Sequence, residues 1–196
     1  MKPAIPLRVW IKSRFADPAL RPLRAEVLAL VPKGACVIDI GCGTGDLLMR
    51  GAEHIGGGVG VDLDRAMVRF AQERAKVHPH IQFRQGSGLS AEGQFDIATA
   101  SLCLHAMAFE NARNLLAHML TLAPTVLIAD FIQPPRFVDK LALELDELIS
   151  GHYLNFYHYR RLGGIESLAK MVNAQIISRH SSSLSCVAIW RLQASC

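Results

Sequence analysis

The sequence has 196 residues, of which 51% are hydrophobic and 19% charged, and we expect one domain spanning residues 1–196 with a substantial core. Its formal net charge of +4 is modest, and a solvated helix face is the favoured explanation of the basic residues near the N-terminus, with binding to RNA or an anionic lipid surface as the alternative. Charged residues and prolines interrupt the apolar stretches, so we expect neither a membrane span nor a signal peptide.

Strand-like and helix-like patterns alternate along the chain, which predicts a parallel sheet with helices on both faces. Asp17 is expected to cap the first helix with Pro18 at its first position, and Asp64 is expected to cap a later helix. The last two strands are separated only by serines and must form an antiparallel hairpin. The fold class is therefore α/β, a three-layer αβα sandwich with a mostly parallel seven-stranded sheet. The expected strands are 36–40, 58–62, 81–84, 95–100, 125–131, 175–180 and 184–192, and the expected helices include 17–30, 46–54 and 64–76.

The most informative segment is 37–48, which reads V-I-D-I-G-C-G-T-G-D-L-L and joins a buried strand to a helix. The apolar run before the glycines is typical of a parallel strand covered on both faces. Gly41, Gly43 and Gly45 permit a tight turn and a close approach of a ligand to the main chain. Such a junction predicts a nucleoside cofactor, with a glycine turn that binds nothing as the alternative.

The spacing of these glycines distinguishes two cofactor classes. Dinucleotide sites carry G-x-G-x-x-G with a pyrophosphate at the helix N-terminus, whereas this chain carries G-x-G-x-G followed by Asp46. A carboxylate there disfavours a phosphate, and Asp39 just before the loop is able to hold an ammonium group. Asp62, at the end of the next strand, can accept both hydroxyls of a ribose in either class. A cofactor with an amino-acid end fits these residues best.

At Asp39, Gly41, Gly43 and Gly45 the sequence matches the pattern D/E-x-G-x-G-x-G and resembles the class I S-adenosylmethionine-dependent methyltransferases. The resemblance covers about residues 17–192. It implies a Rossmann-like fold, the cofactor S-adenosyl-L-methionine, and cofactor contacts from these four residues and from Cys42.

The resemblance also implies cofactor contacts from residues at and after the ends of the next two strands, 58–62 and 81–84. Asp62 would bind the ribose hydroxyls, and Leu63 and Met67 would line the adenine. Ser87 stands where such methyltransferases often carry an aspartate for the adenine amino group, so we expect backbone groups to contribute more to adenine binding in this chain.

The segment S-L-C-L-H at 101–105 resembles the loop after the family's fourth strand. Backbone groups of Ser101 and Leu102 would contact the methionine portion of the cofactor. His105 would lie near the approaching acceptor, and an imidazole with a pKa near neutrality is a candidate catalytic base. A buried histidine that only hydrogen-bonds the main chain is the alternative.

Substrate choice is expected to lie in an insert at about 132–173, which covers the strand ends. After a helical pattern at 137–149, rings and cations crowd together in G-H-Y-L-N-F-Y-H-Y-R-R. Tyr153, Phe156 and Tyr157 are candidates for excluding water or holding a methylated cation, and Arg160 for holding an acidic group. A helix pair that packs these rings into the core is the alternative.

No standard metal motif is present. His152 and His158 are six positions apart, which does not match the i, i+4 pairing of two imidazole ligands, and the five cysteines form no C-x-x-C pair. We expect no metal, no disulfide framework and a reducing, cytoplasmic setting.

These features predict transfer of a methyl group from S-adenosylmethionine to a small-molecule acceptor by in-line displacement. Two other functions stay open at this point: noncatalytic binding of S-adenosylmethionine and, with less support, an NAD-dependent oxidoreductase. The acceptor and the oligomeric state do not follow from the sequence.

Overall fold

The computed structural model describes residues 5–132 and 153–195. The chain divides into two compact units, Met1–Ala98 and Thr99–Cys196, which we call unit 1 and unit 2. Each unit is described by itself below. The organisation of residues 1–196 as a single domain stays a prediction.

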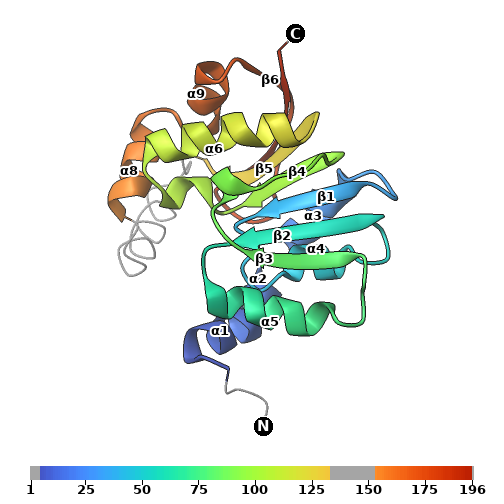
Figure 1. Cartoon of the computed structure of the whole chain (residues 1–196). Helices are drawn as coiled ribbons and strands as arrows, with labels where there is room; N and C mark the ends of the chain where they lie inside the picture. Colours follow the sequence, from blue (N-terminus) through green and yellow to red (C-terminus); the bar gives the residue numbers. More distant parts are fainter. Residues whose placement is uncertain (1–4, 133–152, 196) are drawn as a thin grey trace. The chain divides into compact units, whose positions relative to one another are not determined.

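The strands form the predicted mostly parallel sheet with an antiparallel end (Figure 1). Strand β1 pairs in parallel with β2, and β2 with β3, whereas β7 runs antiparallel to both β5 and β6. The α/β fold class is confirmed. The sheet order is β3-β2-β1-β4-β5-β7-β6, and the strands are β1 (Cys36–Ile40), β2 (Gly57–Asp62), β3 (Ile81–Gln85), β4 (Ile97–Ser101), β5 (Thr125–Phe131), β6 (Ala174–Ser181) and β7 (Val187–Ala194).

In unit 1, helices connect the parallel strands and cover them. Val37, Ile38 and Ile40 of β1 are buried, as expected of a strand packed on both faces. Helix α5 packs against β2 and β3 (Figure 1), and Asp64 caps it by accepting hydrogen bonds from two backbone N–H groups, as predicted. The helices are α1 (Leu7–Ile11), the π-helix η1 (Lys12–Ala16), α2 (Asp17–Ala19), α3 (Arg21–Ala29), α4 (Asp46–Arg50), α5 (Arg65–Ala75) and the 3₁₀ turn η2 (Gly88–Ser90).

The prediction of one helix at 17–30 that Asp17 caps is wrong. Helical structure begins ten residues earlier, and the carboxylate of Asp17 makes no capping bond. It is buried instead and binds the side chains of Arg24 and Thr44. Leu20 separates α2 from α3, because Pro22 has no N–H to continue the hydrogen bonds of the preceding helix.

In unit 2, helices α6 (Phe109–Leu122), α8 (Tyr153–Arg161) and α9 (Gly164–Met171) accompany strands β5 to β7, and a 3₁₀ turn, η3 (Leu104–Ala106), follows β4. Trp190 of β7 is 1% exposed and anchors the core of this unit. The helix expected at 137–149 and His152 lie outside the described residues.

In neither described stretch does a helix have both the length and the apolar character that crossing a membrane requires.

Candidate functional site

The glycine loop of unit 1 is held in a conformation that side chains rarely adopt. Gly41, Gly43 and Gly45 all have positive φ, of 73°, 54° and 74°. The loop is fixed to the end of β2, because the N–H groups of Gly41 and Cys42 both donate to the carbonyl of Val61, at 2.8 and 3.1 Å. The predicted tight turn between β1 and α4 is therefore present.

Asp62 joins this loop to the next crossover. One of its carboxylate oxygens accepts from the N–H of Gly43 at 2.7 Å, and the other accepts from the N–H of Asp64 at 2.8 Å. Asp64 caps α5 as predicted, whereas the ligand-binding role of Asp62 stays a prediction. The carboxylate of Asp62 is thereby held in one orientation, with further lone pairs on each oxygen for a ligand.

Cys42 lies between two acidic residues at the base of the loop. Burial raises the pKa of its thiol far above the ordinary value, and the charges of Asp39 and Asp62 add to this effect. The positive charge of Lys12 acts in the opposite direction. Asp39 is itself buried, at 3% exposure. The thiol therefore stays protonated and is not suited to act as a nucleophile, and the contact of Cys42 with a cofactor stays a prediction.

Three residues predicted to bind adenine lie further along unit 1. Leu63 is 73% exposed, whereas Met67 is buried in the first turns of α5. Ser87 accepts a hydrogen bond from the N–H of Leu89 and so caps the short 3₁₀ turn η2. This local bond is a structural role that could by itself account for a serine at this position. The contact of Ser87 with adenine stays a prediction.

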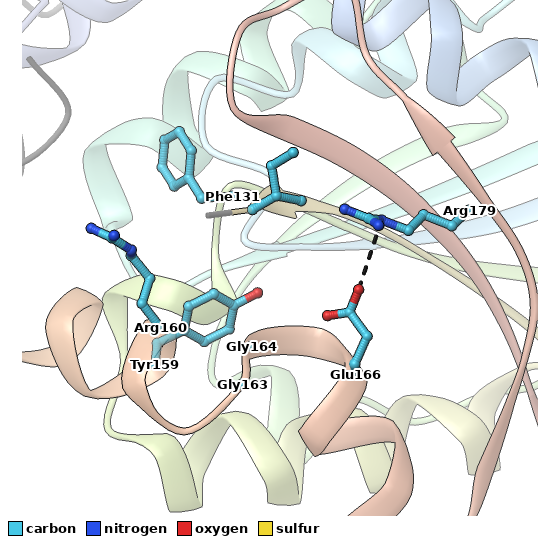
Figure 2. Close-up of a pocket in the computed structure, with 8 residues that line it drawn as sticks. Phe131, Tyr159, Arg160, Gly163, Gly164, Glu166 and Arg179 are labelled. Carbon is cyan, nitrogen blue, oxygen red and sulfur yellow. Dashed lines mark ion pairs between the residues drawn. The ribbon is translucent and has the colours of Figure 1, made fainter. Parts of the chain in front are cut away.

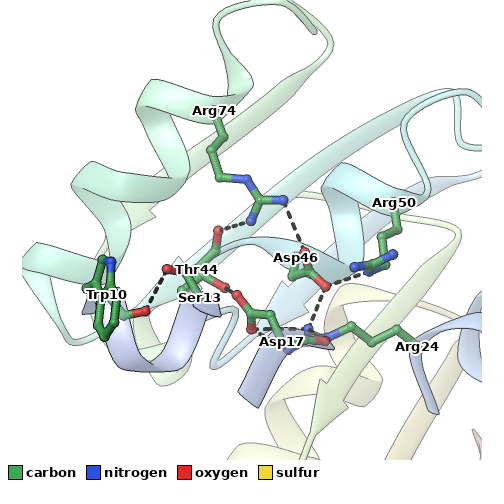
Figure 3. Close-up of polar contacts among 8 residues, drawn as sticks. All are labelled: Trp10, Ser13, Asp17, Arg24, Thr44, Asp46, Arg50 and Arg74. Atoms are coloured by element: carbon green, nitrogen blue, oxygen red, sulfur yellow. Dashed lines mark hydrogen bonds and ion pairs between the residues drawn. The ribbon is translucent and has the colours of Figure 1, made fainter. Parts of the chain in front are cut away.

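Asp46, at the first position of α4, is surrounded by arginines (Figure 3). Its carboxylate binds Arg24 and Arg50 at 2.6 Å each and Arg74 at 3.1 Å. Burial by itself would raise the pKa of Asp46, but the arginines outweigh it and lower the pKa. With its charge compensated in this way, Asp46 does not by itself decide between a phosphate and another ligand. The i, i+4 spacing of Asp46 and Arg50 was the visible sequence signal for this cluster.

In unit 2, His105 forms a buried pair with Asp130. Nδ1 of the imidazole lies 2.5 Å from a carboxylate oxygen of Asp130, and the two side chains are 6% and 0% exposed. Asp130 also accepts from the backbone N–H groups of Leu104, His105 and Phe131. The sequence analysis missed Asp130, although a lone carboxylate in the apolar run of β5 is a visible signal of a polar partner.

The two predicted contact residues just before His105 have unusual surroundings. Leu102 has a φ of 51°, and its N–H donates to the carbonyl of Ala129 at 2.7 Å. The hydroxyl oxygen of Ser101 is buried, and it has no hydrogen-bond partner within the described part of the chain. Strained backbone and unpaired polar atoms gather at functional sites, which is consistent with the predicted role of this loop.

The aromatic residues of α8 separate into a buried and an exposed set. Phe156 is fully buried and lies edge-to-face against the rings of His105 and Phe131, with centroids 5.9 and 5.6 Å away. Tyr157 is 43% exposed. Phe156 therefore supports the wall around the imidazole, as the core-packing alternative describes. Tyr153 begins α8, and its side chain is not described.

A cavity of about 220 Å³ opens beside this cluster within unit 2 (Figure 2). Tyr159, Arg160, Glu166 and Arg179 contribute polar groups to its wall, and Glu166 pairs with Arg179 at 3.7 Å. Burial, with the charges of Asp130 and Glu166, raises the pKa of Tyr159 well above its ordinary value, so its hydroxyl stays protonated. Arg160, a predicted substrate residue, does line a cavity. In the described residues, no three His, Cys, Asp or Glu side chains gather as a metal site would require.

The known proteins to which this chain is similar include several methyltransferases. A family model described as a methyltransferase domain matches residues 37–123. The trans-aconitate 2-methyltransferase of Deinococcus radiodurans is 30% identical over 93 residues, which cover 46% of this chain and 36% of that protein. An uncharacterised methyltransferase of Mycobacterium tuberculosis is 33% identical over 113 residues, covering 54% of this chain and 56% of its own. The chain thus spans about a third to just over half of the length of these curated relatives.

Solved structures extend the likeness over most of the chain. The magnesium protoporphyrin IX methyltransferase of Synechocystis PCC 6803, crystallised with bound SAH, superposes with a TM-score of 0.68 at 18% identity. The likeness covers 92% of this chain and 84% of that one, and at this identity it shows the fold. Residues 37–123 are therefore similar to a methyltransferase domain, and the chain has the fold seen in solved S-adenosylmethionine-dependent methyltransferases.

Proposed function

We propose that the chain binds S-adenosylmethionine through unit 1 and transfers its methyl group to a small-molecule acceptor. The observation that carries the proposal is the glycine loop, whose left-handed backbone is tied through the N–H of Gly43 to the carboxylate of Asp62. A nucleoside needs such a close approach to the main chain beside an acceptor for its ribose diol. Small-molecule names among the relatives, trans-aconitate for one, support the acceptor class.

The residues of unit 1 fit this cofactor from end to end. Asp62 is oriented to accept from the ribose hydroxyls, and Leu63 and Met67 offer apolar surface to the adenine. Asp39 supplies negative charge for the ammonium of the methionine portion, directly or through water. For Ser101 and Leu102, contact with the methionine portion of the cofactor stays a prediction.

The cofactor supplies an activated methyl group on its sulfonium, so the protein mainly has to align the acceptor and, where the acceptor is an O–H or N–H group, to remove a proton. We assign proton removal to His105. Asp130 is a positioning residue: it accepts from Nδ1–H and so presents the basic Nε2 as the other ring nitrogen. This is the tautomer that a general base requires.

The cavity of unit 2 is the proposed place for the acceptor. Its wall combines the ring of Phe131 and the hydroxyl of Tyr159 with the guanidinium of Arg160, so a ring or chain with a polar or acidic group matches the lining. Phe156 and Tyr157 contribute to this proposal only as the supporting wall and the outer surface.

Calorimetric titration tests the cofactor assignment. We expect saturable binding of S-adenosylmethionine and none of NAD; binding of NAD alone would falsify the proposal in favour of an oxidoreductase. Asp62→Ala should weaken S-adenosylmethionine binding about tenfold or more, because two charge-assisted hydrogen bonds are lost. Glu53→Ala, which removes an exposed carboxylate from the same unit, is the matched control and should bind like the wild type.

Methyl transfer itself requires a product. Incubation with methyl-labelled S-adenosylmethionine and a metabolite extract, read by mass spectrometry, should give a labelled small molecule. Tight binding without any labelled product would support the noncatalytic alternative. Asp130→Asn should lower kcat and leave the affinity for S-adenosylmethionine unchanged, which separates positioning of the base from binding of the cofactor.

A further inference from the structure

Lys12 places a positive charge at the glycine loop, although it is not part of the D/E-x-G-x-G-x-G pattern. It is the first residue of the π-helix η1, and its ammonium lies directly over Gly43. A Cβ atom placed on Gly43 would be 2.5 Å from Nζ and 3.2 Å from Cε of Lys12. Gly43 is thus the residue at which the loop leaves room for this side chain. A π-helical turn is rare and is often found at functional sites.

Two polar contacts hold the segment that carries Lys12. Before it, Arg8 of α1 pairs with Asp64 at 2.9 Å, at the start of α5. After it, the buried Asp17 accepts a hydrogen bond from the hydroxyl of Thr44 at 2.6 Å, next to Gly43 (Figure 3). The chain between these contacts has little freedom to move away from the loop. The ammonium is therefore positioned by the fold and not by its own long side chain alone.

The charged groups around the glycine loop are complementary to those of a zwitterionic amino acid. In the described part of the chain no carboxylate forms an ion pair with Lys12. Its charge nevertheless acts on the Cys42 thiol together with those of Asp39 and Asp62. One cation and two carboxylates therefore share this loop. The α-carboxylate and α-ammonium of a methionine portion carry the opposite charges on adjacent atoms.

We propose that Lys12 binds the α-carboxylate of S-adenosylmethionine, while the acidic side of the loop takes its α-ammonium. This inference rests on the proposed function and adds to it the group that recognises the amino-acid end. The ammonium of Lys12 lies where a Cβ atom on Gly43 would come within 2.5 Å of it, so Lys12 contacts the loop at the glycine itself. A pyrophosphate carries a second negative charge, which the two carboxylates at the loop would repel.

A cycle of two ligands and two proteins tests the contact. The ligands are S-adenosylmethionine and decarboxylated S-adenosylmethionine, which lacks only the α-carboxylate, and the proteins are the wild type and Lys12→Gln. We expect the wild type to prefer the carboxylated ligand, and the variant to lose about tenfold of this preference. Lys12→Arg should retain it. Arg14→Gln removes a charge from an exposed position on the same π-helix and should leave both affinities unchanged.

The outcomes separate the contact from the function. If the wild type binds S-adenosylmethionine but Lys12→Gln weakens both ligands equally, or neither, the role of Lys12 is refuted and the cofactor assignment stands. If the wild type binds neither ligand, both proposals fall. Circular dichroism of each variant verifies that a lost preference does not come from unfolding, and a folded Lys12→Gln with wild-type preference would also overturn the inference.

Discussion

Glycines with the same backbone conformation have different surroundings in this chain. Gly34 and Gly45 both have positive φ, of 80° and 74°. A Cβ on Gly34 would meet nothing within 4 Å, whereas a Cβ on Gly45 would lie 2.4 Å from the ring of Phe83 and 3.0 Å from the Cβ of Ala71. The last glycine of the loop is thus required for close packing as well as for its turn.

This difference predicts unequal costs for the same substitution. Gly34→Ala should lower the free energy of unfolding by about 1 kcal/mol, the cost of a left-handed alanine. Gly45→Ala should lower the free energy of unfolding by about 1–3 kcal/mol more than that, because the buried ring of Phe83 has to move. Urea unfolding of both variants measures the two values, and equal losses would contradict the packing argument.

At the scale of elements, the arginine cluster around Asp46 ties three helices of unit 1 together. Arg24 comes from α3, Arg50 from α4 and Arg74 from α5, and Arg74 also donates to the carbonyl of Thr44 in the glycine loop (Figure 3). The cluster therefore helps to hold the glycine loop against these three helices. Its centre is buried, since the side chains of Asp46 and Arg24 are only 4% and 9% exposed.

Asp46→Asn should lower the free energy of unfolding by about 3 kcal/mol near neutral pH, because it leaves the buried guanidinium of Arg24 with one carboxylate partner fewer. Glu73→Gln, which removes an exposed ion pair on α5, is the control and should change it by less than about 1 kcal/mol.

The pH dependence of that difference follows from the lowered pKa of Asp46. Its contribution is fully present above the ordinary value of 3.8 and is lost as the pH falls through the lower value of the folded state. Urea unfolding of wild type and Asp46→Asn should give a constant difference from pH 7 to about pH 4 and a smaller one below. A difference that already shrinks between pH 7 and pH 5 would show that Asp46 is not the group responsible.

The sequence predicted the parallel part of the fold well, because apolar strands and capping residues leave local patterns. The segments 36–40 and 125–131 match β1 and β5, and Asp64 caps α5 as expected. Local patterns do not report pairs that are distant along the chain. The contact of Asp130 with His105 spans 25 positions, and that of Asp17 with Thr44 spans 27.

The candidate site shows the same difference between local patterns and contacts that are distant along the chain. The glycine loop and Asp62 belong to one continuous strand–loop–helix–strand segment, so their spacing alone makes them candidates. Lys12 reaches the loop from a helix outside that segment, and a lysine near the N-terminus carries no signal of its own. Phe156 is a predicted substrate residue because its sequence neighbours are aromatic, but the sequence does not report that its side chain is fully buried.

At the scale of the whole molecule, the boundary between the two units falls within strand β4. Its first residues, Ile97 and Ala98, belong to unit 1, and Thr99 to Ser101 belong to unit 2. A strand cannot lose its partners at one end without weakening the hydrogen bonds of the other. We therefore expect the chain to unfold in one cooperative transition, as the predicted single domain requires.

Two tryptophans allow this expectation to be measured. Trp190 in unit 2 is 1% exposed, whereas Trp10 in unit 1 is 47% exposed. In Trp10→Phe, the fluorescence of Trp190 should change at the same urea concentration as far-UV circular dichroism of the entire chain. Saturating S-adenosylmethionine should move both midpoints upward together, although its proposed contacts are largely in unit 1. Separate midpoints would refute a single cooperative domain.

The π-helix also sets a rule for insertions and deletions near the N-terminus. Each helical residue turns the chain by a set angle, about 100° in an α-helix, so the number of residues between Arg8 and Asp17 fixes the angle between their side chains. Removing one residue from Lys12–Ala16 would rotate one contact away from its partner while the other stayed in place. The length of this segment is therefore under tighter constraint than its composition, and substitutions such as Arg14→Gln should be tolerated where a single deletion is not.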